Sequence, residues 1–154
     1  MEKSPSVAQV LARVSANLRR ADLAVLAAKE RPLRAIGTSN SLYAVLMNLG
    51  LEPGQTSAEL ARAVGVTPQA VHPLVTKLVE RGWVERRVHV RHAGVQELHL
   101  TEDGVREAAR ADRVVEHLDG HLRAGLGEGD YALLAELLAK VSAQVQSWVP
   151  PGDQ

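Results

Sequence analysis

The stretch from Thr67 to Arg81 constrains the fold of this chain more than any other. Thr67 suits a helix N-cap, because its side-chain oxygen can accept a hydrogen bond from an early helical N–H. Pro68 then occupies the first helical position, where a missing N–H costs no bond. Apolar side chains follow at helical spacing, namely Val71, Leu74, Val75 and Leu78. The stripe crosses Pro73 without a break, so the pattern predicts one helix from about Pro68 to Arg81 with one buried face.

The opposite face of this helix is polar. Helical geometry turns Gln69, Pro73 and Thr76 away from the apolar stripe and places His72 and Lys77 on the flanks. Amide, hydroxyl, imidazole and ammonium groups on one face suit a DNA major groove, and a glutamine can pair with adenine N6 and N7. The alternative for Gln69 is an ordinary solvent-facing position.

A shorter helix is expected immediately before. Thr56-Ser-Ala-Glu59 has the pattern of a capping box, in which hydroxyl and carboxylate each satisfy a backbone N–H. Leu60, Ala61 and Val64 give this helix a buried face, and Gly65 can adopt the left-handed conformation that ends it. Two short helices joined by such a turn predict a helix-turn-helix.

A two-stranded hairpin is expected after Gly82. From Trp83 onward the residues alternate, with Val84, Val88 and Val90 expected on the buried face. The other face is expected to carry Trp83, Glu85, Arg87, His89 and Arg91. Residues 91–94 would form the tip, and Leu98 and Leu100 return on the buried side. The predicted fold class is therefore mainly α with a small β-hairpin wing, that is, a winged helix-turn-helix with additional helices.

Several peptides of this region together resemble the multiple-antibiotic-resistance regulator (MarR) family. They are Ser57-Ala-Glu-Leu-Ala61, Val71, Leu74-Val75, Lys77-Leu78, Arg81-Gly82, Val84-Glu-Arg-Arg87 and Leu100-Thr-Glu-Asp-Gly104. The resemblance implies a transcriptional regulator that binds DNA as a homodimer and often responds to an aromatic acid or phenolic compound. The family's wing commonly carries Asp-x-Arg near its tip, and the matching positions here are Arg91 and Ala93.

Composition excludes several other classes. The 154 residues form one domain's worth of chain, and the absence of cysteine removes disulfides, thiolate catalysis and Cys-ligated zinc. Aromatic residues make up 3%, too few for a platform that stacks RNA bases or single strands. The chain has neither a signal-peptide pattern nor an apolar run long enough to span a membrane, so we expect a cytoplasmic protein without membrane contact.

Charge is distributed weakly in favour of DNA binding. The net charge is zero, but residues 56–101 hold six Lys and Arg (62, 77, 81, 86, 87, 91) against four acids (59, 80, 85, 97). This excess of +2 means that affinity must come from local contacts rather than from the field of the whole protein.

Long helices are expected on both sides of the winged helix. The spacing of apolar residues predicts helices over 6–30, over 39–49 after a Ser39 or Thr38 cap, over 102–123 after Thr101, and up to Trp148. We expect a single domain, residues 1–154, with a DNA-binding lobe at about 39–101 and dimerisation helices at about 6–30 and 102–149. The terminal apolar stripes favour a two-fold dimer, and a thicker monomeric core is the alternative.

Other patterns carry little chemistry. Gly125-Leu-Gly-Glu-Gly129 follows a helix and lacks the Lys-Ser/Thr of a phosphate loop, so it predicts a break between helices. His117 and His121 have spacing that can hold zinc, but no third ligand is evident and a solvated pair is the alternative. We expect no metal, no cofactor and no enzymatic activity, because no catalytic constellation is present.

The expected DNA contacts come from both helices and the wing. They are Thr56, Ser57, Thr67, Gln69, His72, Thr76, Lys77, Arg86, Arg87 and Arg91. The arginines would contact phosphates, or else are surface charges of a hairpin. Arg20, Tyr43 and Met47 are the expected lining of an effector pocket. Together these features predict a ligand-responsive repressor on a pseudo-palindromic operator; the competing hypothesis is a winged helix used for protein–protein contact.

Overall fold

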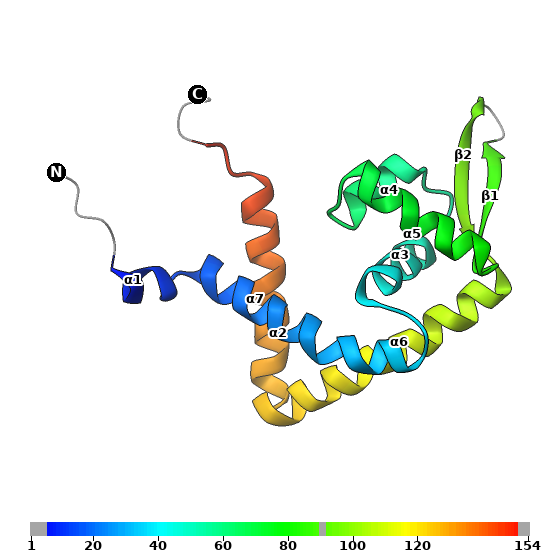
Figure 1. Ribbon diagram of the computed structural model, residues 1–154. Coiled ribbons are helices and arrows are strands. Elements are labelled where there is room, and N and C mark those ends of the chain that lie inside the picture. The colour runs from blue at the N-terminus through cyan, green and yellow to red at the C-terminus, as the bar shows by residue number, and fades with distance from the viewer. Residues whose placement is uncertain (1–5, 90–91, 151–154) are drawn as a thin grey trace. The chain divides into compact units, whose positions relative to one another are not determined.

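The computed structural model describes residues 6–89 and 92–150 as helices, a hairpin and connecting turns (Figure 1). The elements in chain order are α1 (Val7–Leu11), α2 (Val14–Ala35), α3 (Asn40–Leu51), α4 (Ser57–Ala63), α5 (Pro68–Glu80), β1 (Val84–His89), β2 (His92–Leu100), α6 (Glu102–Leu126) and α7 (Glu128–Gln146). The chain divides into two compact units, residues 1–115 and 116–154, and each is described separately below. The predicted class, mainly helical with one antiparallel hairpin, is confirmed.

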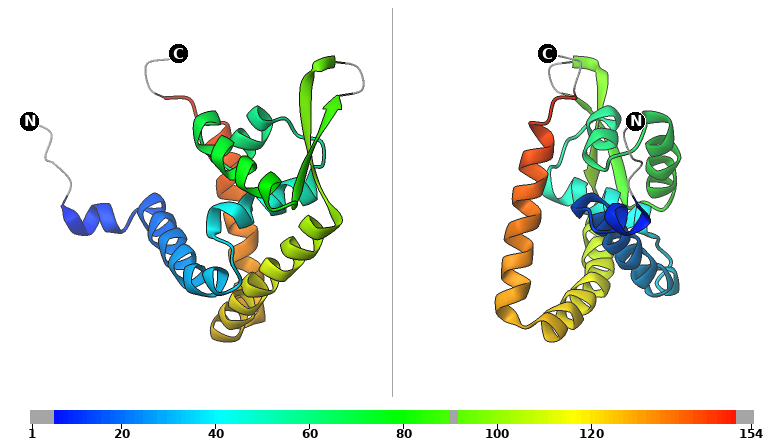
Figure 2. Two further views of the ribbon diagram at one scale, coloured as in Figure 1. Left: turned by 45° about the vertical axis from the view of Figure 1, so that its right-hand side comes forward. Right: turned by 90° about the vertical axis from the view of Figure 1, so that its left-hand side faces the viewer.

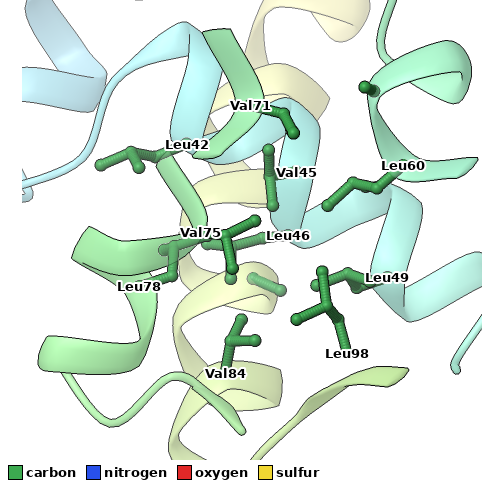
Figure 3. Packing of buried hydrophobic residues seen from close by; sticks show 12 residues of the cluster. Leu42, Val45, Leu46, Leu49, Leu60, Val71, Val75, Leu78, Val84 and Leu98 are labelled. Carbon is green, nitrogen blue, oxygen red and sulfur yellow. The ribbon is translucent and has the colours of Figure 1, made fainter. Parts of the chain in front are cut away.

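The hydrophobic core belongs to the first unit and joins α3, α4, α5, the hairpin and α6 (Figure 3). Its members share apolar side chains that are almost fully buried: Leu42, Val45, Leu46, Leu49, Leu60, Ala61, Val71, Val75, Leu78, Val84, Leu98 and Ala108. Complete burial of a leucine or valine side chain stabilises a fold by about 1.5–3 kcal/mol. This cluster therefore holds the helix-turn-helix and the hairpin in one arrangement.

The predicted helix starts are confirmed. Ser39 caps α3 by accepting from the N–H of Leu42, and Thr67 caps α5 by accepting from the N–H of Ala70. Thr56 and Glu59 form the complete capping box at the start of α4. Because each cap satisfies backbone donors that the helix leaves open, these three starts were visible in the sequence.

Glycine and proline act as predicted around α5. Gly65 (φ +72°) and Gly82 (φ +70°) both adopt left-handed conformations after α4 and α5. The helix α5 continues through Pro73 from Pro68 to Glu80. Its buried residues lie on both sides of Pro73, so packing of that face holds the helix together despite the missing N–H.

The hairpin departs from the predicted alternation in two places. Val84 is buried, but Val88, expected on the same buried face, is 62% exposed. The strands extend beyond the helices of their unit (Figure 2), so the outer half of the hairpin has no core to cover it. Trp83, expected to face outward, instead packs half-buried against the core.

The end of the hairpin also differs from the prediction. The register shifts between Val88 and His89, so the strands do not pair by simple alternation near the tip. Gly94, expected in the turn, lies within β2. Val90 and Arg91 lie outside the described residues.

The predicted helix over residues 6–30 is wrong in both its continuity and its end. The chain breaks between α1 and α2, where Arg13 has an extended backbone and makes no side-chain cap. Asn17 satisfies the open carbonyls there, since its Nδ2 donates to the oxygens of Leu11 and Arg13 at 3.2 and 3.1 Å. At the other end α2 continues through Pro32 to Ala35. Pro32 and Ala28, four residues earlier, are exposed, so water can bind the carbonyl that the proline leaves open.

The last two helices meet at one glycine. Thr101 precedes α6 as predicted, but α6 runs to Leu126 rather than Arg123, and Gly127 (φ +82°) provides the break before α7. The helix α7 ends at Gln146, two residues before the predicted end at Trp148. None of the residues of α7, all of which the structure describes, is buried.

Candidate DNA-binding site

The exposed face of α5 forms the centre of the site. Val71, Val75 and Leu78 are fully buried behind it. On the outer side Gln69, His72, Pro73 and Lys77 are exposed and Thr76 is half-buried. The structure therefore gathers the predicted base-contacting residues on one side of a single helix, which is the arrangement that enters a major groove.

Two threonines among the predicted contacts have hydrogen-bonding roles within the protein. Thr56 Oγ1 accepts from the N–H of Glu59 at 3.3 Å and donates to its carboxylate at 2.8 Å. A phosphate contact through this hydroxyl would therefore disrupt the capping box. Thr67 Oγ1 accepts from the N–H of Ala70 at 3.2 Å, and its proton can still be donated outward.

A hollow between the start of α4 and the hairpin places more of the predicted residues together. Its volume is about 550 Å³, and its lining is small and mixed: Thr56, Ser57, Ala58, Val88, Gly94, Val95 and Gln96. Ser57 is half-buried at the first position of α4, so its hydroxyl and the open N–H groups of the helix start lie at the edge of this hollow. Such a helix start suits a phosphate oxygen.

The two described wing arginines differ in their surroundings. Arg87 lies across the hairpin from Glu97, and its Nε donates to Glu85 Oε1 at 2.8 Å. Arg86 is on the opposite face of β1, paired across the strands with the buried Leu98, and its side chain is exposed. The acids therefore offset much of the charge of Arg87, whereas Arg86 is the better placed for a phosphate. The tip residue Arg91 lies outside the described part of the chain.

Arg81 fixes the end of α5, a role that the sequence did not indicate. Its Nη1 donates to the carbonyl of Gly37 at 2.7 Å, and its guanidinium lies 4.8 Å from the centre of the Trp83 ring. It thereby joins the α2–α3 connection to the start of the hairpin. The neighbouring Arg and Trp were visible in the sequence, but their common partner is 44 residues away from Arg81.

The junction of the hairpin with α6 is also held by contacts that sequence reasoning missed. Thr101 Oγ1 donates to the carbonyl of Gly82 at 2.6 Å and accepts from the N–H of Gly104 at 3.0 Å. A Cβ on Gly104 would lie 1.9 Å from the Trp83 carbonyl oxygen. Only glycine allows α6 to approach β1 this closely.

A cavity of about 320 Å³ lies between α3 and α6. Its lining is mainly apolar: Leu46, Met47, Gly50, Leu51, Leu100, Val105, Ala108, Ala109 and Asp112. Met47 lines this cavity as expected for the effector pocket, and Tyr43 borders it, because its hydroxyl donates to Asp112 Oδ1 at 2.8 Å. Arg20 is exposed on α2 and lines neither this cavity nor a second one of about 250 Å³ beside α2, α3 and α5.

Comparison with known proteins identifies the family. Residues 36–93 match the MarR family. The HTH-type transcriptional repressor Rv2887 of Mycobacterium tuberculosis is 32% identical over 111 residues, which are 72% of this chain and 80% of the relative. This chain belongs to the MarR family.

Solved structures of MarR-family proteins have the same fold. The complex of Rv2887 with salicylic acid matches with a TM-score of 0.72 at 30% identity, over 84% of this chain and 96% of that one. The complex of Rv2887 with DNA matches with a TM-score of 0.73 at 29% identity, over 84% and 98%. The transcriptional repressor CouR, bound to a 23-mer DNA duplex, matches with a TM-score of 0.79 over 91% and 99%, and at 22% identity it supports the fold alone.

As a MarR-family protein, the chain is a DNA-binding transcriptional regulator that acts as a homodimer. The second unit offers an apolar surface for that assembly. Large side chains on and beyond α7 are 40–66% exposed in the single chain: Leu133, Leu134, Leu137, Leu138, Val145, Trp148 and Val149. Contiguous apolar surface of this kind marks an interaction site.

Metal binding and membrane insertion find little support in the described structure. His117 and His121 are exposed on α6, and within the described residues no group of three or more His, Asp or Glu could hold a metal ion. Over the same part of the chain, no helix combines the length and apolarity that crossing a membrane requires.

Proposed function

We propose that this MarR-family protein represses transcription by placing α5 of each protomer in a major groove of a pseudo-palindromic operator. The observation that carries this proposal is the outer face of α5, where Gln69, His72 and Lys77 are exposed on a helix whose other side is fully buried. Arg86 on the hairpin and Ser57 at the start of α4 then contact the phosphates on either side. Phosphate contacts fix the register of the protein, and base contacts give the sequence preference.

Selection of duplexes from a random-sequence pool by the full chain tests this proposal. Two-fold symmetry of a homodimer predicts an enriched inverted repeat whose half-sites are about one helical turn, or about 34 Å, apart. Gln69→Ala should relax the preference at one or two base pairs of each half-site. Enrichment of no motif, or of a motif that Gln69→Ala leaves unchanged, would contradict the assignment of α5.

We also propose that a small aromatic acid or phenol binds the cavity between α3 and α6 and releases the operator. A cavity of about 320 Å³ holds a single-ring compound, and its Met47 and Val105 lining suits an aromatic face. The MarR-family relative Rv2887 has been solved with salicylic acid, which makes salicylate the first compound to try. Binding would favour a separation of the two α5 helices that no longer matches successive major grooves.

A cavity-filling variant provides the test. Ala109 lines the cavity yet is exposed, so Ala109→Trp fills the space without disturbing the core, and Ala109→Ser is the matched control. Salicylate should displace the wild-type protein and Ala109→Ser from the selected duplex at similar concentrations, and Ala109→Trp only at much higher ones. Equal displacement of all three proteins would place the effector elsewhere.

A further inference from the structure

The first two turns of α5 present an unusual set of side chains for a recognition helix. The outward positions are Gln69, Ala70 and Pro73, all exposed. The peptide Pro68-Gln-Ala-Val-His-Pro-Leu74 contains neither arginine nor lysine, and Lys77 comes only in the third turn. The groove-facing start of α5 therefore combines one amide with two apolar surfaces.

This combination matches one kind of base pair. Guanine is most often recognised by a bidentate arginine or lysine, which the start of α5 lacks. A glutamine amide pairs with adenine N6 and N7, and an apolar side chain contacts the C5-methyl group of thymine. In helix-turn-helix proteins the N-terminal residues of the second helix contact the base edges, so these positions decide the preference.

Pro73 is well placed for such an apolar contact. It lies four residues after Gln69, so the two side chains stand one above the other on the same line of the helix. The buried stripe of Val71 and Val75 holds this line outward. Its ring methylenes are rigid and exposed, so a methyl group can be buried against them with little loss of side-chain freedom.

We propose that Pro73, together with Ala70, recognises thymine methyl groups beside the adenine bound by Gln69, so that A·T pairs occupy the operator beneath the start of α5. The inference rests on the proposed role of α5 as the recognition helix and specifies the DNA that it binds. Burial of one methyl group corresponds to about a fourfold gain in affinity.

Replacement of single thymines by deoxyuridine tests the proposal on the wild-type protein. The probe is the duplex selected by the full chain, and deoxyuridine removes only the C5-methyl group while base pairing is kept. Affinity should fall about fourfold at one or two thymines of each half-site. If no deoxyuridine position changes the affinity of the wild-type protein, the proposal is wrong although α5 still binds DNA.

A proline variant assigns the methyl contact to its residue. Pro73→Ser should bind the thymine and deoxyuridine duplexes with nearly equal affinity, while the matched control Pro53→Ser, an exposed proline outside α5, keeps the wild-type difference. Full sensitivity to the methyl group in Pro73→Ser would overturn the role of Pro73. Failure of the wild-type protein to prefer any duplex would instead overturn the proposed function, and this inference with it.

Discussion

The hydroxyl of Tyr43 donates a hydrogen bond to Oδ1 of Asp112 at 2.8 Å, and this bond joins α3 to α6 at the edge of the cavity. The same ring lies 5.5 Å from the ammonium of Lys29 on α2. One side chain thus contacts three helices beside the proposed effector pocket. Because α3 also packs against α5, a ligand that separates α3 from α6 would act directly on the support of the recognition helix.

Removal of this hydroxyl should weaken the contact between α3 and α6. We expect Tyr43→Phe to lower the free energy of unfolding by about 1–2 kcal/mol, because the bond is to a carboxylate and its loss leaves that oxygen short of a donor. Urea denaturation measures the change. Asp112→Asn keeps an acceptor oxygen and should cost less; a larger loss in Asp112→Asn than in Tyr43→Phe would contradict the bond as the source of the effect.

Gly104 should tolerate no side chain. A Cβ there would lie 1.9 Å from the Trp83 carbonyl oxygen, so Gly104→Ala must displace α6 from β1 and should destabilise the protein by more than about 2 kcal/mol. Gly120 is the matched control on the same helix, since a Cβ at that position would meet no atom within 4 Å. Gly120→Ala should leave stability unchanged or raise it by about 0.5–1 kcal/mol through helix propensity. Equal melting temperatures for the two variants would refute the close approach.

Pro73 should make α5 less stable than its sequence otherwise allows. Pro73→Ala restores an N–H that can donate to the carbonyl of Gln69, and an interior proline costs about 3 kcal/mol. We therefore expect thermal unfolding at a higher temperature. Pro68→Ala is the control, because a proline at the first helical position is favourable and its loss should bring no gain. A Pro73→Ala protein that is no more stable than wild type would show that the helix accommodates the ring without strain.

The wing arginines should differ in their effect on salt dependence. Arg86→Ala should reduce the slope of log K against log salt concentration by about 0.9, the value for one lost phosphate contact. Arg87→Ala should change it less, because Glu85 and Glu97 already offset the charge of Arg87. Fluorescence anisotropy with the selected duplex at several salt concentrations measures both slopes. A larger change for Arg87→Ala would mean that its pairing with Glu85 is lost on DNA.

Local signals made the DNA-binding lobe predictable from the sequence. Thr56, Thr67 and Gly82 each determine one helix end through their own side chain or backbone freedom, so the starts and stops of α4 and α5 needed no tertiary information. The outward positions of Gln69 and Lys77 followed from the period of the apolar stripe. The site face was thus readily predicted.

Features that depend on distant partners were not predictable. The break before α2 has no capping side chain at Arg13, and Pro32 remains helical because its face is exposed. Val88 fits the alternation of a buried strand, but its exposure depends on how far the hairpin extends past the core. The cavity, likewise, arises from α3 and α6, which are far apart along the chain, and no periodicity indicates it.

The central claim is that a homodimer binds duplex DNA through α5, and an anisotropy titration tests it most directly. The full chain is titrated against a duplex from the promoter of its own gene and against a scrambled duplex of the same composition, at increasing salt. We predict two chains bound per operator, affinity for the promoter duplex at least about a thousandfold above that for the scrambled one, and a linear fall of log K with log salt. Equal, salt-insensitive binding to both duplexes would contradict the account and favour the winged helix as a surface for protein contact.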